Sequence, residues 1–268
     1  MFIILLVVGL LAGLIAGLFG LGGGILFAPV LLFLFQSGGV PEPVLWTVGT
    51  SLICNFFAAL SSSFKHFQMG NLYVREGVTT GLFGVIGTFI GRFIATSPYY
   101  SEREFTIFFI LILSYSLFHF LRNRKPRRFT TGDNVAPMRW YQSVSIGLAS
   151  GALATLAGVG GGLILVPVMT IILSFGFLKV VSISSLAIVM ITLSGWIQLA
   201  LLNPSVSGYS GLHIGYVDIG VAFPLIAGSF FGARKGVRLL SVIRLRTLEL
   251  ALSVLLLFVV ARLLYGLF

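Results

Sequence analysis

Two glycine runs, Gly22 to Gly24 and Gly160 to Gly162, are the segments of this sequence best suited to bind a small anion. A glycine run stops a helix and leaves backbone N–H groups without a partner in the same turn. A helix is expected to begin again after each run, near Ile25 and near Leu163, and its N-terminus carries free donors and partial positive charge. Glycine has no side chain to keep an oxyanion away from these donors. The candidate binding residues are Gly22, Gly23, Gly24, Gly160, Gly161 and Gly162.

The alternative for the same glycines is that they only allow helices to approach closely, as small residues do in membranes. Two further glycine pairs at a spacing of four favour that packing role more strongly than binding. They are Gly87 with Gly91 and Gly232 with Gly236.

Polar side chains in two other apolar segments are candidates to complete the shell around a bound anion. They are Thr50, Ser51, Asn55, Ser184, Ser185 and Gln198. Hydroxyl groups in such helices often satisfy their own backbone instead. Amide side chains are more costly to bury without partners, so Asn55 and Gln198 are better candidates than the serines.

Lys65 and His66 end one of these segments and form a candidate vestibule that attracts anions. The alternative is that the lysine extends from a buried stem to the membrane surface.

Composition sets the surroundings in which this chemistry takes place. The chain has 268 residues, of which 57% are hydrophobic and 9% charged, whereas a soluble domain carries about 25% charged residues. These values exclude soluble enzymes and disordered chains, and the single cysteine, Cys54, excludes an internal disulfide framework. The net charge of +10 fits basic cytoplasmic loops rather than a nucleic-acid partner. We expect the lipid bilayer as solvent, with no cofactor and no metal site.

Apolar segments of about 20 residues predict the membrane crossings. Six uninterrupted spans are expected at 45–64, 77–96, 104–121, 180–202, 217–233 and 247–267. Two longer stretches, 2–36 and 141–178, are broken by the glycine runs and form either re-entrant hairpins or paired crossings.

If each broken stretch enters and leaves on one face, most of the basic residues fall on the same side of the membrane. The positive-inside rule then predicts that both termini lie outside and that the basic linker 122–140 is cytoplasmic. The linker divides the chain into an N-terminal repeat, 1–121, and a C-terminal repeat, 141–268.

The two halves share sequence blocks in the same order. GLGGGILFAPV at 20–30 aligns with GVGGGLILVPV at 158–168, Thr50-Ser51-Leu52 with Ser184-Ser185-Leu186, and the segment 70–72 with 215–217. Each half is one broken hairpin followed by three spans, and an odd number of spans turns the second half over. The expected fold is therefore an all-α polytopic membrane protein of two inverted repeats, an architecture that recurs in transporters.

These duplicated glycine-rich openings, the Thr/Ser-Ser-Leu blocks and the run Gly215-Tyr216-Val217-Asp218 resemble the sulfite exporter TauE/SafE family across essentially the whole chain. The resemblance implies a bacterial or archaeal plasma-membrane transporter for small sulfur-containing anions such as sulfite, thiosulfate or organosulfonates. The first half departs from the pattern because Tyr73 stands where the second half has Asp218.

Other functions remain as alternatives. One is an anion channel, and another is an intramembrane hydrolase that uses Ser194 with His66 or His213. No predicted span carries a carboxylate at its centre, which favours a facilitator driven by the anion gradient over coupling through a buried acid.

Overall fold

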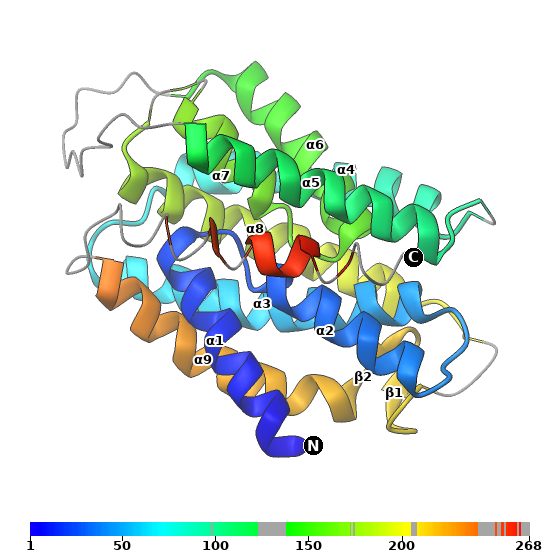
Figure 1. The fold of residues 1–268 in the computed structure, drawn as a ribbon. Coiled ribbons are helices and arrows are strands. Elements are labelled where there is room, and N and C mark those ends of the chain that lie inside the picture. The colour runs from blue at the N-terminus through cyan, green and yellow to red at the C-terminus, as the bar shows by residue number, and fades with distance from the viewer. Residues whose placement is uncertain are drawn as a thin grey trace.

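The fold is described from a computed structural model that covers residues 1–97, 99–122, 138–171, 173, 175–204, 208–240, 250, 253–254, 256–261 and 263. Most of these residues are helical (Figure 1). The helices are α1 (Phe2–Phe19), α2 (Gly24–Ser37), α3 (Pro43–Gln68), α4 (Val74–Ala95), α5 (Glu102–Arg122), α6 (Trp140–Ala157), α7 (Gly162–Ile171), α8 (Phe177–Ala200) and α9 (Ile219–Leu240). A short antiparallel hairpin, β1 (His213–Ile214) with β2 (Val217–Asp218), precedes α9.

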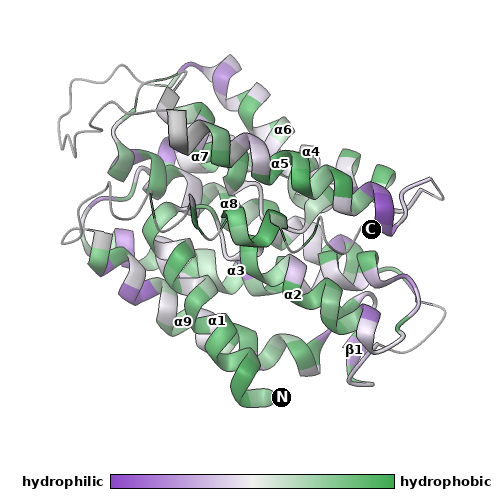
Figure 2. Cartoon of the chain, viewed as in Figure 1, coloured by the Kyte–Doolittle hydropathy of each residue, from purple (hydrophilic) through white to green (hydrophobic). Residues whose placement is uncertain are grey.

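Four helices in the described part of the chain, α1, α3, α4 and α8, are long and apolar enough to cross a membrane. Hydrophobic residues cover most of the visible helix surface, and polar residues gather toward the ends (Figure 2). Large apolar side chains such as Phe33, Phe89 and Phe93 are exposed on the outside of the bundle, a surface that suits lipid rather than water. The chain is therefore an all-α membrane protein.

Glycine ends the first helix of each half. α1 stops at Gly20, with φ 62°, and α6 stops at Gly158, with φ 67°. These left-handed conformations suit glycine and end a helix by turning its last N–H back onto an earlier carbonyl. We call residues 20–23 the first break and residues 158–161 the second break. The predicted restarts near Ile25 and Leu163 are confirmed to within one residue.

Glycines also allow two pairs of helices to lie backbone against backbone. α1 runs beside α9, and a Cβ on Gly13 or Gly232 would lie 2.2 Å from a carbonyl oxygen of the facing helix. α4 runs beside α6, where a Cβ on Gly87 would lie 2.2 Å from the carbonyl oxygen of Leu148. Contacts advance in the same direction along both members, so each pair is parallel. The predicted packing role of these glycine pairs is confirmed.

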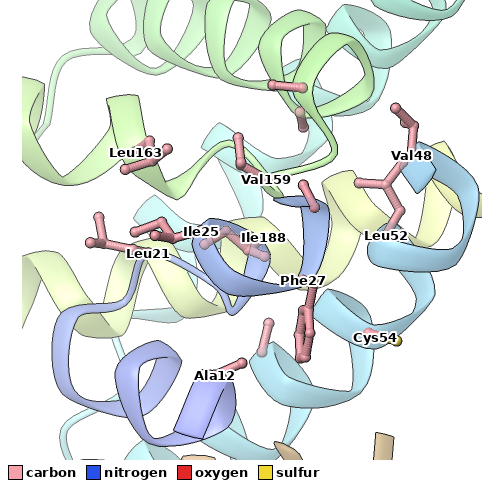
Figure 3. Close-up of a cluster of buried hydrophobic side chains, with 14 of the residues drawn as sticks. Ala12, Leu21, Ile25, Phe27, Val48, Leu52, Cys54, Val159, Leu163 and Ile188 are labelled. Atoms are coloured by element: carbon pink, nitrogen blue, oxygen red, sulfur yellow. The ribbon is translucent and has the colours of Figure 1, made fainter. Parts of the chain in front are cut away.

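Helices α3 and α8 form the centre of the molecule, packed against each other between the two parallel pairs (Figure 1). Around them, α3 also contacts α9 and α8 contacts α4. Val48 and Leu52 of α3 and Ile188 of α8 belong to the same buried cluster as residues of both breaks (Figure 3). The breaks therefore lie in the hydrophobic core.

Basic residues from both halves gather at one end of this bundle. Lys179 Nζ lies 3.8 Å from Glu76 Oε1 and 5.0 Å from the ring centroid of Tyr73. Arg234 lies over Phe64, the neighbour of Lys65, at 5.8 Å. The end of α3, the starts of α4 and α8 and the later part of α9 thus share one end of the molecule.

The predicted spans at 45–64, 77–96, 104–121 and 180–202 correspond to α3, α4, α5 and α8. The span expected at 217–233 is shifted, because Val217 and Asp218 pair in β2 and α9 begins only at Ile219 and runs to Leu240. The span at 247–267 and the linker at 122–140 lie mostly outside the described residues.

Candidate functional site

The two breaks touch each other directly. A Cβ on Gly24 would lie 2.3 Å from the Cα of Val159, and a Cβ on Gly162 would lie 2.4 Å from the carbonyl carbon of Leu21. The contact is reciprocal, because each helix start presses on the break of the other half. Gly24 and Gly162 are thus required for the close approach of the two backbones.

Each break is held by a serine from the other half of the chain. Ser51 Oγ on α3 donates to the carbonyl oxygen of Gly158 at 2.8 Å, and Ser184 Oγ on α8 donates to that of Gly20 at 2.8 Å. These carbonyls end α6 and α1 and have no later helical N–H to accept from. The buried serines therefore satisfy groups that the breaks leave open.

The same contacts correct the alignment of the halves. The sequence blocks pair Ser51 with Ser185, but Ser184 makes the contacts that correspond to those of Ser51. Ser185 Oγ instead donates to Ser182 O within its own helix. A one-residue shift cannot be detected in two blocks that both contain consecutive hydroxyl residues, whereas the direction of the side chain in the helix distinguishes them.

The other break glycines have conformational reasons of their own. Gly22, Gly160 and Gly161 adopt φ values of 72°, 72° and 80°, in the region that favours glycine. Gly23 faces the ring of Phe27, which a Cβ would approach to 2.4 Å. The structure thus explains each of the six predicted glycines without a ligand, and a binding role depends on the polar groups that remain unused.

Unused donors remain in both breaks. Among the described residues, the N–H groups of Gly22, Gly23 and Gly24 have no hydrogen-bond acceptor, and neither do those of Gly160 and Gly161. All these residues are buried. Buried backbone N–H groups are nearly always paired, so a cluster of unpaired ones indicates a place where a ligand or water belongs.

Asn55 adds an unused acceptor beside these donors. Its Nδ2 donates to Gly158 O at 3.0 Å, which fixes the orientation of the amide. The opposite atom, Oδ1, is fully buried and has no partner in the described structure. A Cβ on Gly22 would lie 3.0 Å from this oxygen, and one on Gly160 would lie 3.5 Å from the amide carbon. Leaving such a group unpaired costs about 1–3 kcal/mol.

Other predicted site residues make their contacts away from the breaks. Thr50 Oγ1 accepts from the N–H of Asp218 at 3.0 Å. Gln198 Nε2 donates to Thr88 Oγ1 at 2.8 Å and to Ser194 Oγ at 2.9 Å, which joins α8 to α4. The structure therefore brings Ser51, Asn55 and Ser184 to the breaks, but not Thr50, Ser185 and Gln198.

The predicted vestibule residues differ in exposure. Lys65 is partly exposed, and its Nζ donates to Gln68 Oε1 at 3.3 Å. His66 is fully buried, and neither ring nitrogen has a partner within the described residues. In this conformation His66 does not line an opening to water.

Sequence reasoning missed Ser62, whose buried hydroxyl also has no partner in the described part of the chain. Asn55, Ser62 and His66 are separated by seven and four residues, a spacing that places them on one face of α3. That periodicity was the available signal. It identifies a shared face but does not show that the face is buried or that its polar atoms are unpaired.

Asp218, singled out by the comparison of the halves, has a structural task at the start of α9. Its carboxylate accepts from Ser210 N at 2.8 Å, from Val221 N at 3.0 Å and from Ser210 Oγ. Nearby, Tyr216 donates its hydroxyl to Glu42, and burial together with that carboxylate raises the pKa of Tyr216 to about 12. These contacts hold the 208–218 loop against α3.

Comparison with known proteins finds a matching protein family and several similar membrane proteins. The profile of the sulfite exporter TauE/SafE family matches residues 5–263. A probable membrane transporter protein of Methanocaldococcus jannaschii is 26% identical over 250 residues, which cover 93% of this chain and 90% of that protein. The probable membrane transporter protein YunE of Bacillus subtilis is 27% identical over 280 residues, which cover 98% and 97%. No solved structure matches the chain.

Proposed function

The chain belongs to the sulfite exporter TauE/SafE family, and from this premise we propose that it carries small sulfur-containing anions across the plasma membrane. Sulfite, thiosulfate and organosulfonates are the substrate class, and the protein acts as an exporter or facilitator. Its relatives are named probable membrane transporter proteins, and its apolar helices place it in a bilayer.

The proposed architecture is a pair of inverted repeats, each with a glycine-broken re-entrant hairpin. Both termini lie outside and the linker 122–140 lies in the cytoplasm. The ends of the two hairpins support this arrangement. Gln36, at the end of α2, donates to Glu102, whereas Phe175, just after α7, lies beneath Lys179 at the basic end of the bundle. Contacts of this kind, with hairpin ends on opposite sides of the bundle, support the proposed inverted repeats.

The observation that carries the proposal is the meeting of the two breaks, where N–H groups and Asn55 Oδ1 are unpaired in the described structure. An oxyanion accepts hydrogen bonds from backbone donors without needing a buried cation. A carbonyl oxygen repels a bare anion but accepts from one that carries a proton. Within the sulfur anions, the site therefore favours species with a hydrogen-bond donor, such as hydrogen sulfite.

In the proposed mechanism, the two equivalent halves open the site alternately to the two sides of the membrane. Opening the contact between the breaks toward one face and then toward the other would expose the anion alternately, as in other inverted-repeat transporters. Asp218 is the buried carboxylate of the described structure, and its oxygens are already hydrogen bonded. We therefore assign no coupling role to it and propose a facilitator that follows the anion gradient and the membrane potential.

A flux panel in proteoliposomes tests the function. Sulfite, thiosulfate, sulfate, sulfoacetate and a sulfur-free anion of the same charge are compared with wild-type protein and with Asn55→Leu. The proposal predicts saturable flux of one or more of the reduced-sulfur or sulfonate anions, and loss of that flux in Asn55→Leu. Flux of the sulfur-free anion alone would contradict the substrate class.

The control variant is Cys54→Ala. Cys54 is the neighbouring residue, equally buried, but its sulfur points toward Ala222 of α9 and not toward the breaks. It should retain flux. Glycine substitutions are poorer probes, because a Cβ on Gly161 would lie 2.6 Å from Ser150 O and would distort the fold itself.

A further inference from the structure

One face of α3 carries unpaired polar atoms from the breaks to its end. Asn55 Oδ1, Ser62 Oγ and both ring nitrogens of His66 are buried without a partner in the described structure. Because the three residues are spaced by seven and four positions, they form a stripe on α3 about 16 Å long, at 1.5 Å per residue. We call Asn55, Ser62 and His66 the α3 stripe.

Burial alone does not explain why the polar atoms of the α3 stripe lack partners. The neighbouring residue Ser61 is 1% exposed, as buried as Ser62, yet its Oγ donates to Phe230 O of α9 at 2.7 Å. Buried hydroxyls in this region thus find partners when they face a neighbouring helix. Ser62 faces a different direction and has none, although buried polar groups are ordinarily paired.

The packing of the fold does not require polar residues at these positions either. The equivalent contacts of Ser51 and Ser184 align the sequence of α8 with that of α3. In this alignment Ile188, Gly195 and Leu199 are the second-half equivalents of Asn55, Ser62 and His66. Ile188 confirms the alignment, because it lies beside Gly160 as Asn55 lies beside Gly22. At these equivalent positions the second half has apolar residues or glycine, and all three are buried.

We propose that the α3 stripe lines the path by which the anion moves between the breaks and the end of the molecule that carries Lys65, and that this path is closed in the present structure. The inference rests on the proposed transport function. Polar atoms that lack partners in the closed form would bond to water and to the passing anion in the open form. Lys65, beside His66 at the end of α3, gives the mouth of the path a positive charge that attracts anions.

Cysteine accessibility tests this path with a matched pair. In a Cys54→Ala background, which has no other cysteine, Ser62→Cys is compared with Ser61→Cys. Open membrane fragments are treated with a charged, membrane-impermeant maleimide, and the labelled fraction of purified protein is followed by mass. We expect Ser62→Cys to react at least about tenfold faster, because a thiol reacts only where water and reagent reach it. His66→Cys serves as a second reporter on the stripe and should also react.

Equal rates for Ser62→Cys and Ser61→Cys, with His66→Cys also unreactive, would overturn the path. The result is separable from the substrate assignment. Labelling of the stripe without sulfur-anion flux supports a hydrated path and contradicts only the proposed substrate. Sulfur-anion flux with an unreactive stripe contradicts the path and leaves the transport function standing.

Discussion

The reciprocal serine contacts at the breaks predict that two equivalent substitutions have unequal effects. Ser184→Ala removes the donor to Gly20 O, and no other donor in the described structure reaches that carbonyl. Ser51→Ala removes the corresponding donor to Gly158 O, but Asn55 Nδ2 still donates to the same oxygen at 3.0 Å. The two variants delete the same hydroxyl from similar buried positions.

The magnitude follows from what each substitution leaves behind. Ser184→Ala leaves a buried carbonyl unpaired, which costs about 1–3 kcal/mol. Ser51→Ala only loses one of two hydrogen bonds, and a polar contact between membrane helices is worth about 0.6 kcal/mol on average. We therefore expect the free energy of unfolding to fall more in Ser184→Ala than in Ser51→Ala.

Unfolding of the purified protein by a denaturing detergent in mixed micelles measures both values. The double variant of Ser51→Ala with Asn55→Ala provides a further check, because Gly158 O then loses both donors. Its cost should exceed the sum of the two single costs by roughly 1 kcal/mol. An equal or larger cost for Ser51→Ala than for Ser184→Ala would refute the reasoning.

Three further predictions concern stability. Gly24→Ala should destabilise the protein by about 2 kcal/mol or more, because its Cβ would overlap the second break. Gly39 has open space around it, so Gly39→Ala should cost only about 1 kcal/mol, which comes from the positive φ of this residue. Unfolding titrations that ranked the two variants in the reverse order would contradict the packing. Asp218→Ala should weaken the cap of α9 by about 1 kcal/mol because it removes the acceptor of Val221 N and Ser210 N. It should also speed proteolysis of the 208–218 loop, and an unchanged digestion rate would count against the cap. Burial and Glu42 raise the pKa of Tyr216 to about 12. The stability that the Tyr216 hydroxyl contributes is complete below the usual tyrosine pKa of about 10 and is lost as pH rises toward 12. Tyr216→Phe should therefore lose less free energy of unfolding across that interval than wild type. Parallel curves of stability against pH for the two proteins would contradict this.

Much of the fold could be predicted because membrane helices must be continuous and apolar. The glycine runs indicated where α1 and α6 end, and left-handed Gly20 and Gly158 are the physical reason. The start of the span expected at 217–233 was misplaced because Val217, an apolar residue of β2, is as hydrophobic as the helix that follows it.

The site was less predictable because depth along a helix does not determine which neighbour a side chain faces. Asn55 and Gln198 had equal claims by residue type, yet Asn55 faces the breaks and Gln198 faces Thr88 of α4. Ser62 was missed because it lies in the run Ser61-Ser62-Ser63, and its spacing from Asn55 and His66 does not show that its hydroxyl is buried without a partner. The role of the break glycines in backbone-to-backbone contact likewise required both halves of the fold.

Anomalous scattering from selenite, the heavier analogue of sulfite, tests the central claim most directly. Crystals of the protein soaked with selenite should give a selenium peak where the two breaks meet, at a position from which the selenite oxygens can hydrogen bond to Asn55 and to the N–H groups of Gly22 to Gly24. The same peak should be absent in Asn55→Leu. Selenium found only beside surface arginines and lysines, with none between the breaks, would contradict anion binding at this site.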